Sequence, residues 1–373
     1  MTPEDITGVA IAAVVVVAVA VVWIVWRRSQ PPTTINSLAH VGPWVVDDDE
    51  TNPESKSGQY SKGSVATTKA SSDSSESIAF LGDDQDDMLQ LWRLHERDVV
   101  PRVLVARGAF GEVWRGEYRG TSVAMKKLLP TRASVTPAAM ATFVSEILLM
   151  AKLESPFIVH FVGVSWYRKT EMTLVVEFMD SGDLRSLLDA TTPATLILDT
   201  KLSIALSVIH ALVYLHTLDM PIIHRDIKSR NVLLDSLKGT KVTDFGISRE
   251  TSTDTMTMGI GTCRWMAPEI LIDSHYSPAA DVYSFGILLA ELDMHILPYS
   301  DQVNASGVML TGAAIMGRVL QGNIQPTFST RFPPALLALA QSCLAFNPDD
   351  RPDATQVAFQ LRQLTKRADM TDK

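Results

Sequence analysis

The chain has 373 residues, of which 46% are apolar and 20% charged, so most of it can bury a core, and global disorder and a collagen-like repeat are excluded. The net charge is −9, and residues 1–95 hold 6 basic and 13 acidic side chains against 27 and 29 in the rest. A body without a basic stripe predicts no nucleic-acid partner. Cys263 and Cys343 are too few for a disulfide framework, and no Cys/His cluster has metal-ligand spacing, which indicates a reducing compartment.

Residues 6–26 predict a single transmembrane helix. They form a run of 21 residues without a charge, which as a helix spans roughly 31 Å against a hydrocarbon core of about 30 Å. Arg27 and Arg28 follow at once, so the positive-inside rule places the rest of the chain in the cytosol and residues 1–5 outside, as a short extracytosolic tail. The alternative is a cleaved signal peptide and a secretory protein, but Glu4 and Asp5 precede the run without any Lys or Arg.

Residues 27–95 have the composition of a linker. They include Pro31-Pro32, an acidic run at 47–50, and nine serines between Ser55 and Ser77. Such a stretch buries too little apolar surface to offset its chain entropy, which predicts a disordered acidic tether between the membrane and a folded domain over residues 96–366. Residues 367–373 are expected to be a short C-terminal tail.

The folded domain begins with strand patterns and continues with helical ones. Apolar segments at 100–106, 111–118 and 121–129 are separated by Gly or polar turns and predict antiparallel strands. Thr136 and Pro137 then offer an N-cap and a first-turn proline to an amphipathic helix. Further strand patterns precede helical periodicity at 201–218, 281–292 and 334–344. This order indicates an α+β fold with two lobes.

Short motifs in this domain carry chemistry. The glycine-containing segment 106–113 lies between two predicted strands, where backbone N–H groups could approach phosphate oxygens; a plain tight turn is the alternative. Lys126 lies on the next strand, and Glu146 lies twenty residues further on in the amphipathic helix. An exposed lysine and a solvated glutamate would be the purely structural interpretation of that pair.

The segment His224-Arg225-Asp226-Ile227-Lys228-Ser229-Arg230-Asn231 is far more specific. Asp226 could accept a hydroxyl proton, Lys228 could neutralise a transferring phosphate, and Asn231 could offer an amide oxygen to a hard metal ion. Asp244-Phe245-Gly246 follows with a second oxygen ligand on a glycine turn. Ala267-Pro268-Glu269, a motif around Asp281, and Arg351-Pro352 come later in the same order.

This ordered set resembles the eukaryotic protein kinases, from about residue 98 to 366. The resemblance implies a bilobal fold, with a small antiparallel-sheet lobe carrying one helix and a larger, mainly helical lobe. It implies ATP and Mg²⁺ as cofactors and protein hydroxyls as substrates. Asp226 would be the catalytic base assisted by Lys228, Lys126 would hold the ATP phosphates and be oriented by Glu146, and Asn231 and Asp244 would bind metal. The nucleotide would also contact Ala106, Arg107, Gly108, Ala109, Phe110 and Gly111 in the phosphate loop, Val113 and Ala124 above the base, and Val176, Glu177 and Met179 in the hinge.

Subgroup features point to serine and threonine as acceptors. Lys228-Ser229 and the segment 261–269 resemble the tyrosine-kinase-like group of serine/threonine kinases, in which Thr262 would help to position the acceptor. A dual-specificity kinase and a pseudokinase scaffold are the alternatives. Ala106 departs from the family, because it stands at the first glycine position of the phosphate loop; alanine is tolerated there only at negative φ.

The resemblance also implies regulation and partners. Phosphorylation of Thr253, Thr255 and Thr257 by an upstream kinase would neutralise Arg225 and order the loop before Ala267; solvated loop residues without a regulatory role are the alternative. The family further pairs Glu269 with Arg351 and uses Asp281 to anchor the catalytic loop. The oligomeric state stays open. The remaining histidines show no partner pattern and are assigned to the surface or to a satisfied core: His95, His160, His210, His216, His275 and His295.

Overall fold

The computed structural model describes residues 83–371, except 109–110, 130–134, 246–261 and 274–275. The predicted span at 6–26, most of the predicted linker, Ala109, Phe110 and the threonines between 251 and 257 lie outside these residues.

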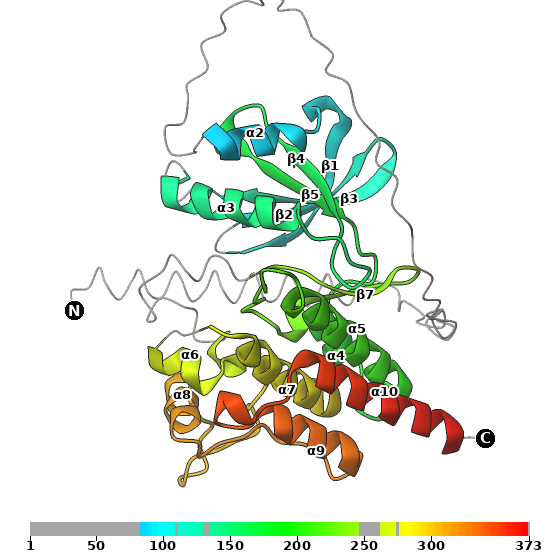
Figure 1. Ribbon diagram of the computed structural model, residues 1–373, viewed down its shortest axis with the longest axis vertical. Coiled ribbons are helices and arrows are strands. Elements are labelled where there is room, and N and C mark those ends of the chain that lie inside the picture. Colours follow the sequence, from blue (N-terminus) through cyan, green and yellow to red (C-terminus); the bar gives the residue numbers. More distant parts are fainter. Residues whose placement is uncertain (1–82, 109–110, 130–134, 246–261, 274–275, 372–373) are drawn as a thin grey trace, which may run out of the picture. The chain divides into compact units, whose positions relative to one another are not determined.

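Five antiparallel strands form the first lobe (Figure 1), in the order β1-β2-β3-β5-β4. Their bounds are β1 Val99–Arg107, β2 Gly111–Tyr118, β3 Thr121–Leu128, β4 Phe161–Ser165 and β5 Thr173–Glu177. The three strands predicted at its start are confirmed. Side chains alternate between the two faces of β3, which places Val123 and Met125 in the core at 1% exposure. The backbone of Lys126 pairs with β2 on one side and with β5 on the other.

Helix α3, Pro137–Met150, is the amphipathic helix that the sequence predicts. Thr136 caps it by accepting a hydrogen bond from the Ala139 N–H at 3.2 Å, and Pro137 fills the first turn. Its apolar face is buried with residues of β4 and β5 in one core cluster. Burial of this face fixes the rotation of α3, which in turn directs Glu146.

The predicted linker is wrong at its end, because residues 83–95 are folded. Helix α2, Asp83–Leu91, buries Leu89 completely, and Asp86 forms an ion pair with Lys169 at 2.5 Å. The chain then pairs with β4, where the Leu94 N–H donates to the Val164 carbonyl at 2.8 Å. The composition did not indicate this helix, since it has four aspartates and few apolar residues. Burial of Leu89 stabilises the helix where local helix propensity is too weak to do so.

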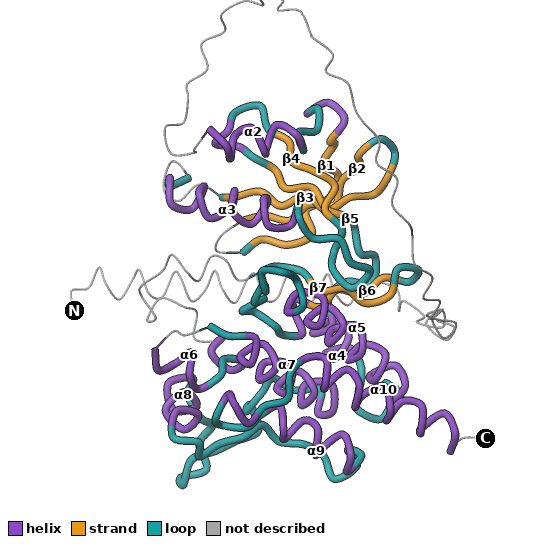
Figure 2. The backbone as a smooth tube through the Cα atoms, viewed as in Figure 1, coloured by secondary structure: helices purple, strands orange, loops and turns teal. Residues whose placement is uncertain are grey.

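Helices and a small hairpin make up the second lobe (Figures 1 and 2). The helices are α4 Leu184–Ala190, α5 Leu198–His216, α6 Pro268–Asp273, α7 Pro278–Met294, α8 Gly312–Leu320, α9 Pro334–Cys343 and α10 Ala354–Thr371, and the hairpin joins β6 Val232–Asp235 to β7 Gly239–Val242. Short 3₁₀ helices lie at Glu96–Asp98, Lys169–Glu171, Ser229–Asn231, Thr262–Trp265 and Pro348–Asp350. Because α10 continues to Thr371, the domain extends past the predicted boundary at 366.

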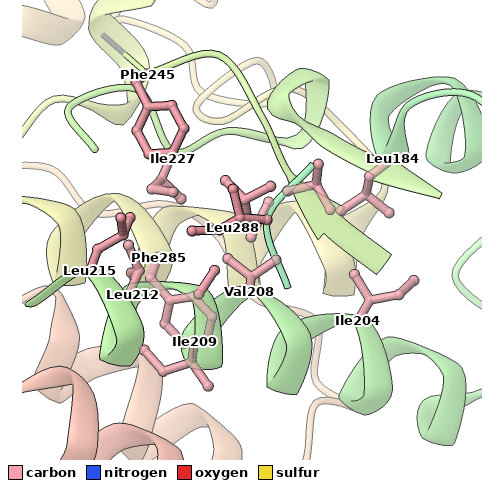
Figure 3. Close-up of a cluster of buried hydrophobic side chains, with 14 of the residues drawn as sticks. Leu184, Ile204, Val208, Ile209, Leu212, Leu215, Ile227, Phe245, Phe285 and Leu288 are labelled. Carbon is pink, nitrogen blue, oxygen red and sulfur yellow. The ribbon is translucent and has the colours of Figure 1, made fainter. Parts of the chain in front are cut away.

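Helix α5 contributes many side chains to the core of this lobe (Figure 3). Val208, Ile209, Leu212 and Leu215 are fully buried in the same cluster as Phe285 of α7. Among the described residues, α5 is the one helix long and apolar enough to cross a membrane, and half of its apolar window is buried in the protein. Packing in the lobe accounts for its hydropathy. The core also includes Ile227 and Phe245, so the segments that carry the predicted catalytic residues rest on it.

Candidate active site

Lys126 of β3 lies between two carboxylates. Its Nζ is 2.6 Å from Glu146 Oε1 on α3 and 3.0 Å from Asp244 Oδ1, which follows β7. The interpretation of Lys126 and Glu146 as an exposed pair is therefore wrong. Burial alone would lower the pKa of Lys126, but the negative charges of Asp244 and Glu146 outweigh it and raise that pKa. The lysine is thus held as a cation where β3 faces α3.

The two carboxylates respond differently to this environment. The Lys126 charge lowers the pKa of Asp244, half of whose side chain is exposed, so Asp244 is an anion. Burial raises the pKa of Glu146, with Lys126 opposing that effect. Asp244 also has a left-handed backbone, with φ of 59°. A strained, ionised carboxylate beside a cation is typical of a binding site rather than of a structural turn.

Asp226 lies in a second group of polar side chains. Its Oδ2 accepts hydrogen bonds from Lys228 Nζ at 2.7 Å and from Asn231 Nδ2 at 2.9 Å, and Asn231 Nδ2 also donates to the Asp226 carbonyl at 2.8 Å. The structure therefore brings together the three polar residues predicted from this motif. Since the Asn231 amide nitrogen makes these bonds, its amide oxygen is the atom that could ligate a cation.

Helix α7 anchors this loop through buried Asp281. Asp281 Oδ2 accepts from the His224 N–H and Oδ1 from the Arg225 N–H, each at 2.8 Å. His216 Nε2, to which the sequence assigned no partner, lies 2.9 Å from Asp281 Oδ2. Arg225 is left-handed, with φ of 70°, and the bond to its N–H helps to hold that strained conformation.

Sequence reasoning missed Glu291, a second buried carboxylate of α7. It is 1% exposed and accepts from Ser229 Oγ at 2.5 Å and from Trp265 Nε1 at 2.7 Å, while Arg185 Nη1 lies 3.3 Å away. Burial raises the pKa of Glu291, and these donors oppose that effect. The available signal was its position in the otherwise apolar run 285–292, where a solvated glutamate would be out of place.

The phosphate loop is a hairpin between β1 and β2. The Gly108 N–H donates to the Gly111 carbonyl at 2.9 Å, and Arg107 pairs with Glu112 at 3.1 Å. Ala106 pairs with Val113 and is not among the described residues with positive φ, so alanine fits this position without strain. The departure from the family pattern is therefore compatible with the loop.

The hinge follows β5. Val176 pairs with Ala124 of β3, and the Glu177 N–H donates to the His160 carbonyl at 3.0 Å. Met179 is buried at 5% exposure. Burial would raise the pKa of Glu177, but hydrogen bonds from Lys241 and from the His160 N–H lower it. The sequence predicted the backbone role of this segment and gave no indication of the ion pair.

Asn231 and Asp244 fit a magnesium site. Mg²⁺ retains several waters and usually takes one or two carboxylates together with substrate phosphates, so a carboxylate and an amide oxygen near a cationic lysine suffice. The described residues contain no group of three or more His, Cys, Asp or Glu side chains that could hold a metal alone. A metal bound by these two residues would depend on oxygen atoms of its substrate.

Glu269 and Arg351 form the ion pair that the sequence predicts. Arg351 Nη1 and Nη2 lie 2.7 and 2.8 Å from the two Glu269 carboxylate oxygens, and the Arg351 side chain is fully buried. This bidentate pair ties the first turn of α6 to the segment before α10.

Comparison with known proteins agrees with the geometry. Residues 102–360 match the protein kinase domain, and the chain belongs to the protein kinase family. Among its relatives in Arabidopsis thaliana, it is 35% identical to serine/threonine/tyrosine-protein kinase HT1 over 69% of the chain and 64% of that protein. It is 33% identical to serine/threonine-protein kinase STY17 over 74% and 46%, and 32% identical to serine/threonine-protein kinase CTR1 over 77% and 34%.

These matches confirm the resemblance to eukaryotic protein kinases of the tyrosine-kinase-like serine/threonine group. They also confirm the bilobal fold. Membership implies use of ATP and a divalent metal ion. The chain spans 64%, 46% and 34% of the three relatives it was compared with, so it covers less than two thirds of each.

Proposed function

We propose that this protein transfers the γ-phosphoryl group of ATP to serine and threonine hydroxyls of protein substrates. The observation that carries the proposal is the arrangement of Asp226, Lys228 and Asn231 in one group and Lys126, Glu146 and Asp244 in another. The first can accept a hydroxyl proton and neutralise charge, while the second can hold phosphates and a cation. A bound Mg²⁺ would supply charge stabilisation to the phosphates.

Each residue then has a definable task. Asp226 accepts the proton of the acceptor hydroxyl, and its bonds to Lys228 and Asn231 keep the carboxylate in one orientation. Lys228 is close enough to Asp226 to place positive charge beside the oxygen that attacks. Lys126 binds phosphate oxygens, and Glu146 limits its freedom. Asn231 and Asp244 supply the metal-binding oxygens.

The test is a kinase assay on the full chain with a degenerate library of Ser, Thr and Tyr peptides. We expect phosphorylation of Ser and Thr peptides, with Asp226→Ala lowering kcat by about 10²-fold or more while nucleotide binding persists. Asp226→Asn, which preserves side-chain volume, should lose comparable activity. Wild-type turnover in either variant would disprove the assignment of the base.

The same assay separates the alternatives. Binding of Mg·ATP without transfer to any peptide would favour the pseudokinase scaffold. Transfer to tyrosine as well would favour a dual-specificity kinase, an outcome that the name of the relative HT1 makes worth measuring. Catalysis is favoured over scaffolding because five residues have suitable chemistry and contacts: Lys126, Glu146, Asp226, Asn231 and Asp244.

We also propose that residues 6–26 anchor the protein in a membrane, with the kinase domain in the cytosol and a role in signalling. The support is the uncharged run followed by Arg27 and Arg28. Deleting residues 1–28 should release the protein from carbonate-washed membranes, whereas the full chain should pellet. Pelleting of the truncated protein would contradict the anchor.

Phosphorylation of Thr253, Thr255 and Thr257 is proposed as the activating step. The support is a threonine-rich segment after Asp244 together with Arg225 beside the proposed base. Phosphatase treatment should lower activity, and replacing all three threonines by alanine should reproduce that loss. Full activity of the triple variant with intact Mg·ATP binding would exclude this switch.

A further inference from the structure

Two lysines of the β6–β7 hairpin form ion pairs with the side chain of Glu177 in the hinge. Lys241 Nζ lies 2.6 Å from Glu177 Oε1, and Lys238 Nζ lies 3.3 Å from Glu177 Oε2. The side chains of Glu177 and Lys241 are only 14% and 11% exposed, which distinguishes them from the solvated pairs that contribute little. Lys241 lies 64 positions beyond Glu177 in the sequence, and the loop after β5 runs beside the β6–β7 hairpin (Figure 2).

Lys238 makes a further contact that reaches the backbone. Its Nζ donates a hydrogen bond to the Phe178 carbonyl. The peptide group between Phe178 and Met179 is planar, so this carbonyl and the Met179 N–H point in opposite directions. Fixing one end of the peptide group fixes the other. We infer that Lys238 is a positioning residue that directs the Met179 N–H towards the adenine of the nucleotide, an inference that rests on the proposed ATP-dependent function.

The hairpin is rigid enough for this role. Asp235 Oδ1 accepts from the Leu237 and Lys238 N–H groups at 3.0 and 2.9 Å, and Gly239 provides the left-handed residue of the turn, with φ of 76°. Asp235 Oδ2 lies 3.2 Å from Lys238 Nζ. The same carboxylate therefore holds both the backbone and the ammonium group of Lys238. A preorganised donor loses little entropy when it binds the hinge.

The residues after Met179 are fastened to the same hairpin. The Asp180 N–H donates to Asp235 Oδ2 at 3.1 Å, and the Ser181 N–H donates to the Leu234 carbonyl at 3.0 Å. In return, the Ser236 N–H donates to Asp180 Oδ1 at 2.8 Å. Met179 thus lies between two anchored points, Phe178 and Asp180, and its peptide plane has little freedom to rotate.

The side chain of Phe178 contacts the sheet of the first lobe. Arg115 of β2 lies over the Phe178 ring, with 4.9 Å between the guanidinium carbon and the ring centroid. Arg115 Nε also donates to Ser122 Oγ at 3.2 Å. The sheet therefore restrains the Phe178 side chain while Lys238 restrains its carbonyl. Both contacts restrain Phe178, and the bond from Lys238 acts directly on the orientation of the peptide group.

The test compares Lys238→Met with Lys238→Arg, which retains a donor, and with Lys366→Met, the same substitution at an exposed position of α10, as a control. Dissociation constants of the Mg complexes of ATP, 1-deaza-ATP and 7-deaza-ATP are measured on the full chain, with melting temperature recorded for every variant. The analogues remove, one at a time, the two ring nitrogens that flank the 6-amino group. The analogue that the wild type binds more weakly identifies the acceptor of the Met179 N–H.

We expect Lys238→Met to weaken ATP binding and raise KM by about 5- to 20-fold with little change in kcat, since one orienting hydrogen bond is lost. It should weaken binding of the identified analogue by less than about twofold, because the two changes remove one interaction. Lys238→Arg should recover most of the affinity, and Lys366→Met should resemble the wild type.

Equal losses for ATP and for the identified analogue would show that Lys238 acts only on stability, and would overturn the inference. Unchanged ATP affinity in Lys238→Met would also overturn the inference. The same holds if the wild type binds both analogues with the same affinity as ATP. Failure of the wild type to bind Mg·ATP would instead contradict the proposed function. The two failures are therefore distinguishable.

Discussion

Two glycines of the phosphate loop should respond to alanine in opposite ways. A Cβ added to Gly111 would lie 2.4 Å from the Lys127 carbonyl oxygen, because β2 and β3 are in close register there. A Cβ added to Gly108 would meet no atom within 4 Å, and Gly108 is not among the described glycines with positive φ. One glycine is thus required by packing, and the other is available for ligand approach.

The magnitudes follow from these contacts. In Gly111→Ala the backbone of β3 must shift, and overpacking of this kind costs about 1–3 kcal/mol, or roughly 2–10 °C in melting temperature for a domain of this size. Gly108→Ala should change stability by no more than about 0.5 kcal/mol, since no neighbour is displaced. Its methyl group would occupy space beside the bound phosphates and raise KM for ATP.

Thermal denaturation and steady-state kinetics, measured on the same preparations, check both halves of this prediction. Gly111→Ala should melt earlier, whereas Gly108→Ala should melt like the wild type and show a higher KM for ATP at a similar kcat. An unchanged melting temperature in Gly111→Ala would refute the packing argument. Wild-type kinetics in Gly108→Ala would refute the assignment of this loop to the phosphates.

Two further predictions concern stability. Leu89→Ala should destabilise the domain by about 2–5 kcal/mol in chemical denaturation, because a fully buried side chain is removed, whereas Leu91→Ala on the same helix, at 76% exposure, should cost almost nothing; equal effects would show that α2 does not dock. His210, which accepts a hydrogen bond from Arg362 at 3.1 Å, has its pKa lowered from 6.5 to about 4 by burial and by the Arg362 charge. The unfolded chain therefore takes up this proton first, and the free energy of unfolding should fall as pH drops from 6.5 to about 4; His210→Gln should flatten that part of the stability curve, and an unchanged slope would contradict the assignment.

The sequence predicted those parts of the site that local patterns encode. The period of two along 121–129 gives β3 and the place of Lys126, and the cap at Thr136 with the helical period after it gives α3 and the place of Glu146. Asp226, Asn231 and Asp244 belong to short motifs whose spacing carries their chemistry. Asp226 and Asn231 are hydrogen-bonded to each other, and Asp244, which follows β7, contacts Lys126.

Residues whose role depends on a distant partner could not be predicted in this way. Glu177 and Lys241 are separated by 64 positions, and no periodicity relates them. Glu291 stabilises Ser229 from a helix that begins far along the chain. Helix α2 was missed for a related reason, since its composition is that of a linker and its order comes from burial of Leu89 in another part of the fold.

The buried polar contacts divide the site between two anchors of the helical lobe. Asp281 and Glu291 of α7 determine the path of residues 224–229, and the β6–β7 hairpin determines the path of the hinge. A buried carboxylate destabilises the fold unless hydrogen-bond donors surround it. Asp281 and Glu291 therefore require the segment 224–229, which supplies such donors. Loosening of the catalytic loop would leave Asp281 without the N–H groups of His224 and Arg225, and this penalty keeps the loop in place before any nucleotide binds. Among the described residues, the ion pairs of Lys126 link Glu146 of α3 to Asp244 after β7, so the geometry of this site depends on where α3 places Glu146.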